Sequence, residues 1–146
     1  MTGPASTHLT TDLARLPTAE HALVVGNGTE AEASWLADRG WKVTTVERDL
    51  TGLAADSEHY GLVASLYVPV VGSAEDLVLQ LARAVRPDGI LYLLGHLAPG
   101  QNQISSDDAI AALSPDPWEI VIAEERARAA DDGEDSVFYA EKSGSF

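Results

Sequence analysis

Short apolar runs alternate with helical patterns along most of the chain, and this alternation limits the possible folds more than any other feature. The runs at residues 22–25, 41–46, 62–68 and 90–94 are short and rich in aliphatic or β-branched side chains, as buried strands are. Helical patterns follow the first run and precede the last. Strands that alternate with helices build a parallel sheet, so the sequence predicts an α/β fold.

The last part of the chain departs from this alternation. Residues 118–123 and 136–141 are strand-like runs, and the charged segment between them carries Asp132-Gly133 as a turn signal. We expect an antiparallel strand pair that finishes the sheet. The acidic residues at 131–132 and 134–135 are most simply interpreted as the solvated tip of this hairpin.

Length and composition indicate one domain. The chain has 146 residues, enough to bury a core that needs no disulfide or metal. Residues 1–19 have the composition of a flexible lead-in with a short helix that Pro17 ends. Residues 20–146 form the predicted domain, and no repeat or low-complexity block divides it.

The charge balance excludes several function classes. The net charge is −14 and the nine basic residues form no stripe, so we expect no nucleic-acid binding.

The chain has no cysteine. This excludes zinc-finger proteins, enzymes with a cysteine nucleophile and thiol-redox proteins. His8, His21 and His59 show no ligand spacing, and we assign no metal.

We also expect no membrane segment and a cytoplasmic location. The longest nearly apolar stretch, residues 61–72, is far shorter than the roughly 20 residues of a membrane-spanning helix. Residues 1–11 lack the basic cluster and apolar run of a secretory signal.

A glycine turn marks the candidate binding site. Gly26-Asn27-Gly28 follows the first predicted strand and precedes a helix that Gly28 or Thr29 can cap. Exposed N–H groups and the helix dipole favour an anionic or polar ligand at such a junction. Glu47 stands 19 positions after Gly28, at the end of the second strand, where an acid can accept hydrogen bonds from ribose hydroxyls. This combination indicates a nucleoside.

Two other interpretations of this turn stay open. Residues 26–31 also fit the dinucleotide fingerprint that ends in alanine, although the chain after Glu47 is too brief for a separate catalytic domain. The glycines also fit a tight turn that binds nothing.

Four segments together resemble a known family. Residues 22–30, 34–47, 60–68 and 81–91 look like successive segments of the class I, seven-stranded S-adenosylmethionine-dependent methyltransferases. The resemblance covers about residues 20–142. It implies a three-layer sandwich around a mostly parallel, Rossmann-like sheet.

The resemblance also implies a cofactor, S-adenosylmethionine, and residues that hold it. Gly26 and Gly28 would pass beneath its methionine part and ribose, with Asn27 and Thr29 in the same turn. Glu47 would hold the ribose hydroxyls and Arg48 would flank the adenine, while Ser65 and Leu66 would border the sulfonium. Catalysis in this family is chiefly placement, because acceptor and methyl group are held in line.

Two residues are candidates on the acceptor side. His96 follows the predicted strand at residues 90–94 and could act as a base, because histidine titrates near neutral pH. A lone loop histidine is more often incidental. Tyr67 is similarly placed, with closure of the core as its alternative role.

Three positions differ from the family pattern. Val24 stands where the family has an acid, Glu30 where it has a third glycine, and Pro69 where many close relatives have a histidine. Val24 cannot hold the ammonium group of the methionine moiety, and Glu30 brings bulk and negative charge toward the cofactor. The glycine motif is therefore degenerate.

A fourth difference is a deletion. Only fifteen residues separate Glu47 from Val63, where the family usually has a helix and a third strand. We expect about six strands, in the order 2-1-4-5-7-6 by family numbering, with the second strand exposed as an edge. Lys42 and neighbouring threonines could restrain aggregation there. A homodimer contact or a partner protein could cover this edge instead.

Two functions therefore remain. The first is a small S-adenosylmethionine-dependent methyltransferase with a small-molecule acceptor. The second is a degenerate methyltransferase fold that transfers no methyl group, and that serves as a binding or assembly partner or catalyses another reaction. Fold analogy alone does not separate them.

Overall fold

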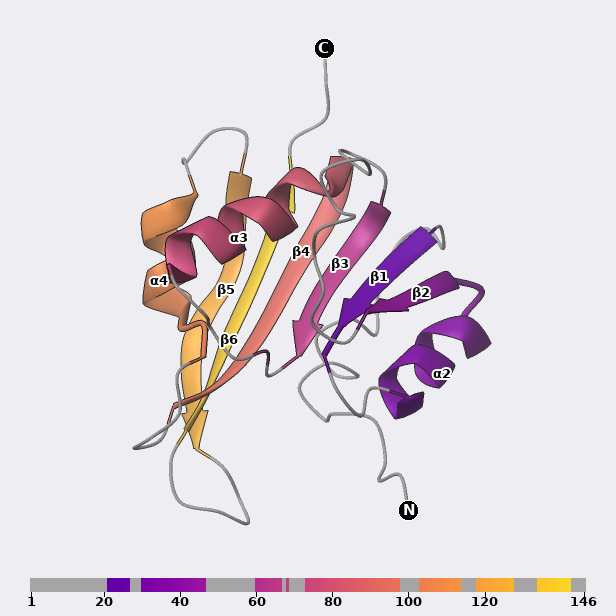
Figure 1. Ribbon diagram of the computed structural model, residues 1–146, viewed down its shortest axis with the longest axis horizontal. Coiled ribbons are helices and arrows are strands. Elements are labelled where there is room, and N and C mark those ends of the chain that lie inside the picture. The colour runs from indigo at the N-terminus through magenta and orange to yellow at the C-terminus, as the bar shows by residue number, and fades with distance from the viewer. Residues whose placement is uncertain are drawn as a thin grey trace.

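The computed structural model describes residues 21–26, 30–46, 60–66, 68, 73–97, 103–113, 118–127 and 134–142. Within these ranges the chain forms one mixed α/β sheet with helices packed on it (Figure 1). The expected lead-in at residues 1–19 lies outside the described residues.

The described elements follow the predicted alternation. In chain order they are β1 (His21–Val25), α2 (Glu30–Asp38), β2 (Lys42–Val46), β3 (Tyr60–Leu66), α3 (Ala74–Arg83), β4 (Val85–Leu97), α4 (Ser106–Ala112), β5 (Trp118–Ala127) and β6 (Glu134–Lys142).

The sheet has the expected strand order. Its six strands run β2-β1-β3-β4-β6-β5. The pairs β1·β2, β1·β3 and β3·β4 are parallel, whereas β6 is antiparallel to both β4 and β5. This order confirms a shortened Rossmann-like sheet with an antiparallel terminal pair. Strand β2 is an edge of the sheet in the described part of the chain.

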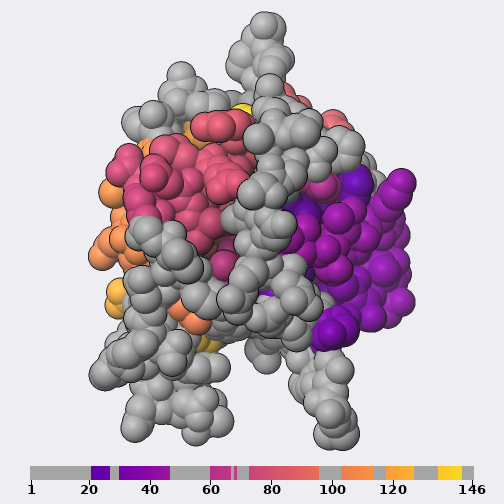
Figure 2. Space-filling view, in the orientation of Figure 1, coloured from indigo at the N-terminus to yellow at the C-terminus, as the bar shows by residue number. Residues whose placement is uncertain are grey.

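Alternation along the strands builds two apolar cores, one on each face. Leu91, Leu93 and Phe138 belong to the core that α3 and α4 cover. Tyr92 and Leu94, one residue out of phase, belong to the opposite core, which includes residues of α2. Successive side chains of a strand point to opposite faces of the sheet. A central strand that is buried on both faces therefore has a continuous apolar run in its sequence. In the view of Figure 2 the α3 surface lies on the left and the α2–β2 surface on the right.

Two local details differ from what the sequence alone indicates. Arg86-Pro87-Asp88-Gly89 has the composition of a turn, but it lies inside β4. The pairing shifts between Tyr60 and Leu62, so the extra residues form a bulge in which Asp88 takes a φ of 69°. A Cβ at Gly89 would lie 2.8 Å from the carbonyl oxygen of Arg86, which explains glycine there.

The second detail is the start of α4, because either of two adjacent serines could cap this helix. Ser105 is its N-cap: the Ser105 hydroxyl accepts a hydrogen bond from the Asp108 amide, and the Asp108 carboxylate accepts one from the Ser105 amide. Ser106 lies inside the helix, and its amide donates to Ser136 Oγ at 2.5 Å. This bond ties α4 to β6.

None of the helices in the described ranges is long and apolar enough to cross a membrane.

The core that α3 and α4 cover predicts that two truncations lower the free energy of unfolding by different amounts. Phe138 is 1% exposed in β6, so Phe138→Ala should lower the free energy of unfolding by about 3–5 kcal/mol. Ile110→Ala in α4, where the side chain is 44% exposed, should change it by roughly 1 kcal/mol or less. Urea unfolding followed by circular dichroism measures both, and equal losses would contradict this account of the core.

Candidate functional site

The sheet changes direction at β1, and this defines the candidate site. Strand β1 pairs with β2 on one side and with β3 on the other, so the connection from β1 leads to one side of it and the connection from β2 leads back to the other side. In open α/β sheets, ligands bind outside the carboxyl ends of the strands at such a switch point. At this end Val25 lies opposite Val46 of β2 and Ser65 of β3. The ends of β1 and β3 meet near the lower centre of Figure 1.

Gly26 is the first residue beyond β1. Its amide donates to the carbonyl oxygen of Val46 at 2.8 Å, which continues the β1·β2 ladder by one bond. Its φ is 141°, a region that glycine alone adopts easily. The backbone therefore turns away from the sheet here without a side chain, and α2 begins at Glu30.

The first turn of α2 is acidic, and its two glutamates differ. Glu30, at the position where the resemblance implies a third glycine, is exposed to solvent. Glu32 is only 8% exposed, a burial that the sequence did not predict. Both carboxylates lie in the first turn, where the helix dipole favours negative charge.

Val24 is fully buried in the core on the α2 face. A valine there supplies packing and no carboxylate. That this position holds no ammonium group stays a prediction.

Ser65 and Leu66 end β3 at the same edge of the sheet. Ser65 pairs with Val25 and Leu93, and Leu66 pairs with Leu94. Both are buried, with Ser65 at 1% exposure. The structure therefore brings three predicted cofactor residues, Gly26, Ser65 and Leu66, to neighbouring strand ends.

His96 lies inside β4, which extends to Leu97, so the expectation of a loop histidine is wrong. The reason is strand pairing: β6 continues alongside β4 beyond the apolar run, and His96 is the register partner of Asp135. Only the backbone of His96 is described.

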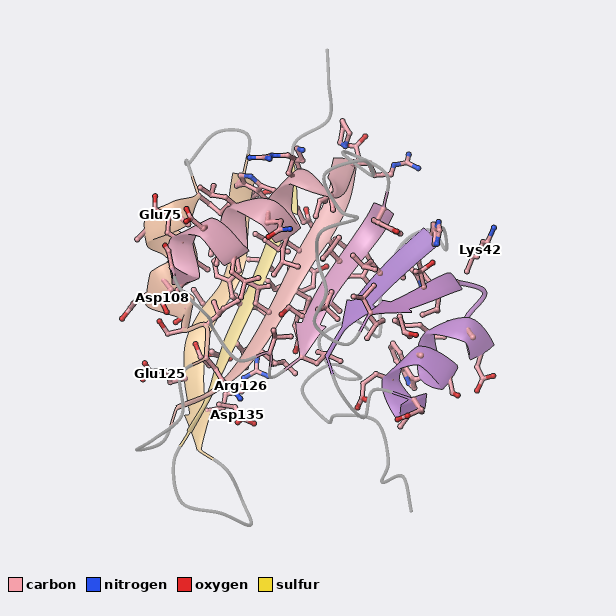
Figure 3. All side chains as sticks on the ribbon, viewed as in Figure 1. Lys42, Glu75, Asp108, Glu125, Arg126 and Asp135 are labelled. Carbon is pink, nitrogen blue, oxygen red and sulfur yellow. The ribbon has the colours of Figure 1, made fainter. Side chains whose placement is uncertain are left out.

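Asp135 corrects a second expectation. It was interpreted as part of a solvated hairpin tip, but it is 4% exposed within β6. Its register partner on the other side is Arg126 of β5, whose guanidinium forms an ion pair with Glu124 at 2.6 Å. Figure 3 shows Arg126 and Asp135 together at the end of the sheet where β4 finishes.

The remaining predicted site residues lie outside the described ranges. They are Asn27, Gly28, Thr29, Glu47, Arg48 and Tyr67, and their roles stay predictions. Among the described residues, no group of three histidines or acids could hold a metal ion.

Solved structures with the same fold are numerous. The chain superposes on an S-adenosylmethionine-dependent methyltransferase from Mesorhizobium loti with a TM-score of 0.67 and 13% identity, covering 94% of this chain and 98% of that one. The 1,6-didemethyltoxoflavin-N1-methyltransferase of Burkholderia thailandensis, solved with S-adenosylhomocysteine, matches with a TM-score of 0.67, 13% identity, and coverage of 93% and 75%. The [4+2]-cyclase SpnF matches with a TM-score of 0.60, 14% identity, and coverage of 94% and 81%.

No protein-family model matches the sequence, and no curated protein matches it. The structural likeness therefore establishes the fold, which is that of the class I S-adenosylmethionine-dependent methyltransferases.

The positive φ of Gly26 predicts that a side chain at this position destabilises the folded protein. Gly26→Ala should lower the free energy of unfolding by about 1–3 kcal/mol, because an L-residue at this φ is strained. Ala111→Gly on the exposed face of α4 offers a comparison in which only helix propensity changes, by about 1 kcal/mol. Chemical denaturation measures both variants, and an unchanged Gly26→Ala protein would contradict the geometry described for this turn.

Proposed function

We propose that the chain is a small S-adenosylmethionine-dependent methyltransferase that acts on a small-molecule acceptor in the cytoplasm. The observation that carries this proposal is the switch point itself: Gly26, with its positive φ and no side chain, stands beside the buried end of β3 and before α2. The structures that share this fold include methyltransferases, one of them solved with S-adenosylhomocysteine.

The proposed cofactor site fits the described residues at its ribose and sulfonium side. Gly26 lets a ligand approach the backbone, and Asn27, Gly28 and Thr29 would continue that turn. Glu47 would accept hydrogen bonds from the ribose hydroxyls, and Arg48 would flank the adenine. Ser65 and Leu66 would border the sulfonium from the end of β3. Val24 offers nothing to the ammonium group, so the methionine end would be held less firmly.

The cofactor, when bound, supplies an activated methyl group. The protein's part is then to hold the acceptor in line with that group and to exclude water. His96 at the end of β4 is the proposed base for an acceptor that must lose a proton, and Tyr67 is a second candidate.

Calorimetric titration with S-adenosylmethionine and S-adenosylhomocysteine tests this function. We expect micromolar binding, and Glu47→Ala should weaken it about 10- to 100-fold, because hydrogen bonds to a charged group are lost. Glu75→Ala, which removes an exposed carboxylate from α3, serves as the matched control and should bind normally. The absence of heat from the native protein at millimolar ligand would exclude the methyltransferase proposal.

A second candidate is favoured by Val24 and by the edge strand. A fold member with no acid at position 24 could have lost methyl transfer while it keeps a ligand site, and SpnF shows by its name that this fold occurs in a cyclase. In this case we propose that a second copy or a partner protein covers β2, where Lys42 and Thr45 are exposed. Strict monomers in sedimentation at high concentration would argue against a second copy on this edge.

A further inference from the structure

We propose that the outer edge of β5 (the β5 edge) binds an extended, basic segment of another protein, which pairs with it as an additional strand of the sheet. The β5 edge lies at the opposite end of the sheet from β2, and this inference does not depend on methyl transfer. The bound segment carries lysine or arginine on either side of a short apolar run.

The first observation is the place of β5 in the sheet. It pairs with β6 on one side, and no other strand in the described part of the chain flanks it. The N–H and C=O groups on the outer side of an edge strand can pair with a further strand. Strand β5 has 10 residues, whereas β2 at the other edge has 5. The β5 edge is therefore the longer template for such pairing.

The second observation is that apolar side chains are exposed on this strand. The neighbours Ile120 and Val121 are 41% and 51% exposed. The pairing with β6 shifts between Ile120 and Ile122, so Val121 is an extra residue in the ladder. Residues 122–127 then pair with β6 without a further shift. The β5 edge thus has a regular stretch of backbone beside exposed apolar side chains.

The third observation is the charge of the strand. Glu119, Glu124 and Glu125 are exposed, and Arg126 forms an ion pair with Glu124 at 2.6 Å. Three glutamates and one arginine give β5 a net charge of −2. Like charges opposite each other destabilise a strand pair, and opposite charges stabilise it. The β5 edge therefore disfavours a second copy, which brings the same negative charge, and favours a basic segment.

Helix α4 extends this surface on one face of the sheet. Ile120 lies on the face that α4 covers, because its register partner in β6 belongs to the core under that helix. On α4 itself, Asp107 and Ile110 are exposed. Figure 3 shows Glu125 of β5 and Asp108 of α4 on the same side of the molecule. The surface beside the β5 edge is thus also both apolar and acidic.

The combination of these features points to a partner more than each feature does alone. Charged residues on an edge strand commonly prevent pairing between copies of a protein. Single exposed apolar side chains are ordinary on protein surfaces. A long edge that has both can exclude its own copies and still bind a strand of opposite charge. In strand addition, hydrogen bonds of the main chain supply affinity and the side chains supply specificity.

Titration of the full chain with two synthetic peptides tests the proposal. In the first peptide lysine alternates with valine and threonine, and in the second glutamate replaces every lysine. We expect the lysine peptide to shift the backbone amide signals of residues 119–126 in a saturable way, while those of residues 31–38 and 42–46 stay in place. The glutamate peptide should bind at least about tenfold more weakly, because it brings like charge to the β5 edge.

Amide hydrogen exchange shows whether the peptide pairs as a strand. Outward-facing N–H groups alternate along an edge strand, so exchange should slow at alternate residues of 122–127 in the saturated complex. Unchanged exchange at all of these residues would overturn strand pairing, even if the amide signals shift.

Glu125→Lys tests the charge at the β5 edge. It should weaken binding of the lysine peptide about tenfold or more, because an attraction becomes a repulsion. Asp38→Lys is the matched control: it makes the same change of charge at an exposed residue of α2 and should bind normally. Equal weakening in both variants would overturn the inference, since net charge alone would then attract the peptide.

Three further results would overturn the proposal. They are no saturable shift at millimolar lysine peptide, equal binding of the two peptides, and shifts of residues 119–126 that depend on the concentration of the protein alone. The last result would make a second copy the occupant of the β5 edge. None of these measurements involves S-adenosylmethionine, so their failure and that of the proposed function are distinguishable.

Discussion

Strand β1 and its two parallel neighbours impose the constraint on which the rest of the structure depends. Because β2 lies on one side of β1 and β3 on the other, the order of the strands reverses at β1. Gly26 allows the backbone to turn there at a φ of 141°. The position of the candidate site follows from this topology rather than from any single catalytic residue.

The sequence predicted the architecture well, because the physical signals for it are local. Apolar runs at residues 22–25 and 90–94 indicate buried strands, and Gly26 indicates the turn between strand and helix. Strand order came from the resemblance of ordered segments to a known family, and the observed order β2-β1-β3-β4-β6-β5 agrees with it.

The sequence failed where pairing between distant strands overrides local composition. Acidic residues near a turn look like a solvated tip, yet Asp135 is buried because β4 and β5 flank it on both sides. His96 follows the apolar run at residues 90–94 and therefore looked like a loop residue. It lies in β4 because pairing with β6 continues the strand beyond that run. Arg86-Pro87-Asp88-Gly89 has turn chemistry, but pairing of Tyr60 with Val85 draws it into β4 as a bulge.

The structure describes two of the positions that differ from the family pattern, Glu30 and Val24. Glu30 points into solvent, so its charge need not obstruct the strand ends, whereas Val24 is part of the core and cannot be replaced by an acid without burying a charge. Under the proposed function, the loss would fall on the methionine end of the site, and the ribose and sulfonium end would keep its backbone frame. On this account a cofactor would be held mainly by Gly26, Ser65 and the predicted contact of Glu47.

The most direct test of a ligand site at the switch point is a map of backbone amide signals during titration with S-adenosylhomocysteine. The account predicts that the signals of Gly26, Ser65 and Leu66 shift in a saturable way, while those of Ile120 in β5 and Leu79 in α3 stay in place. Saturable shifts confined to other strands, or no shifts at millimolar ligand, would contradict it.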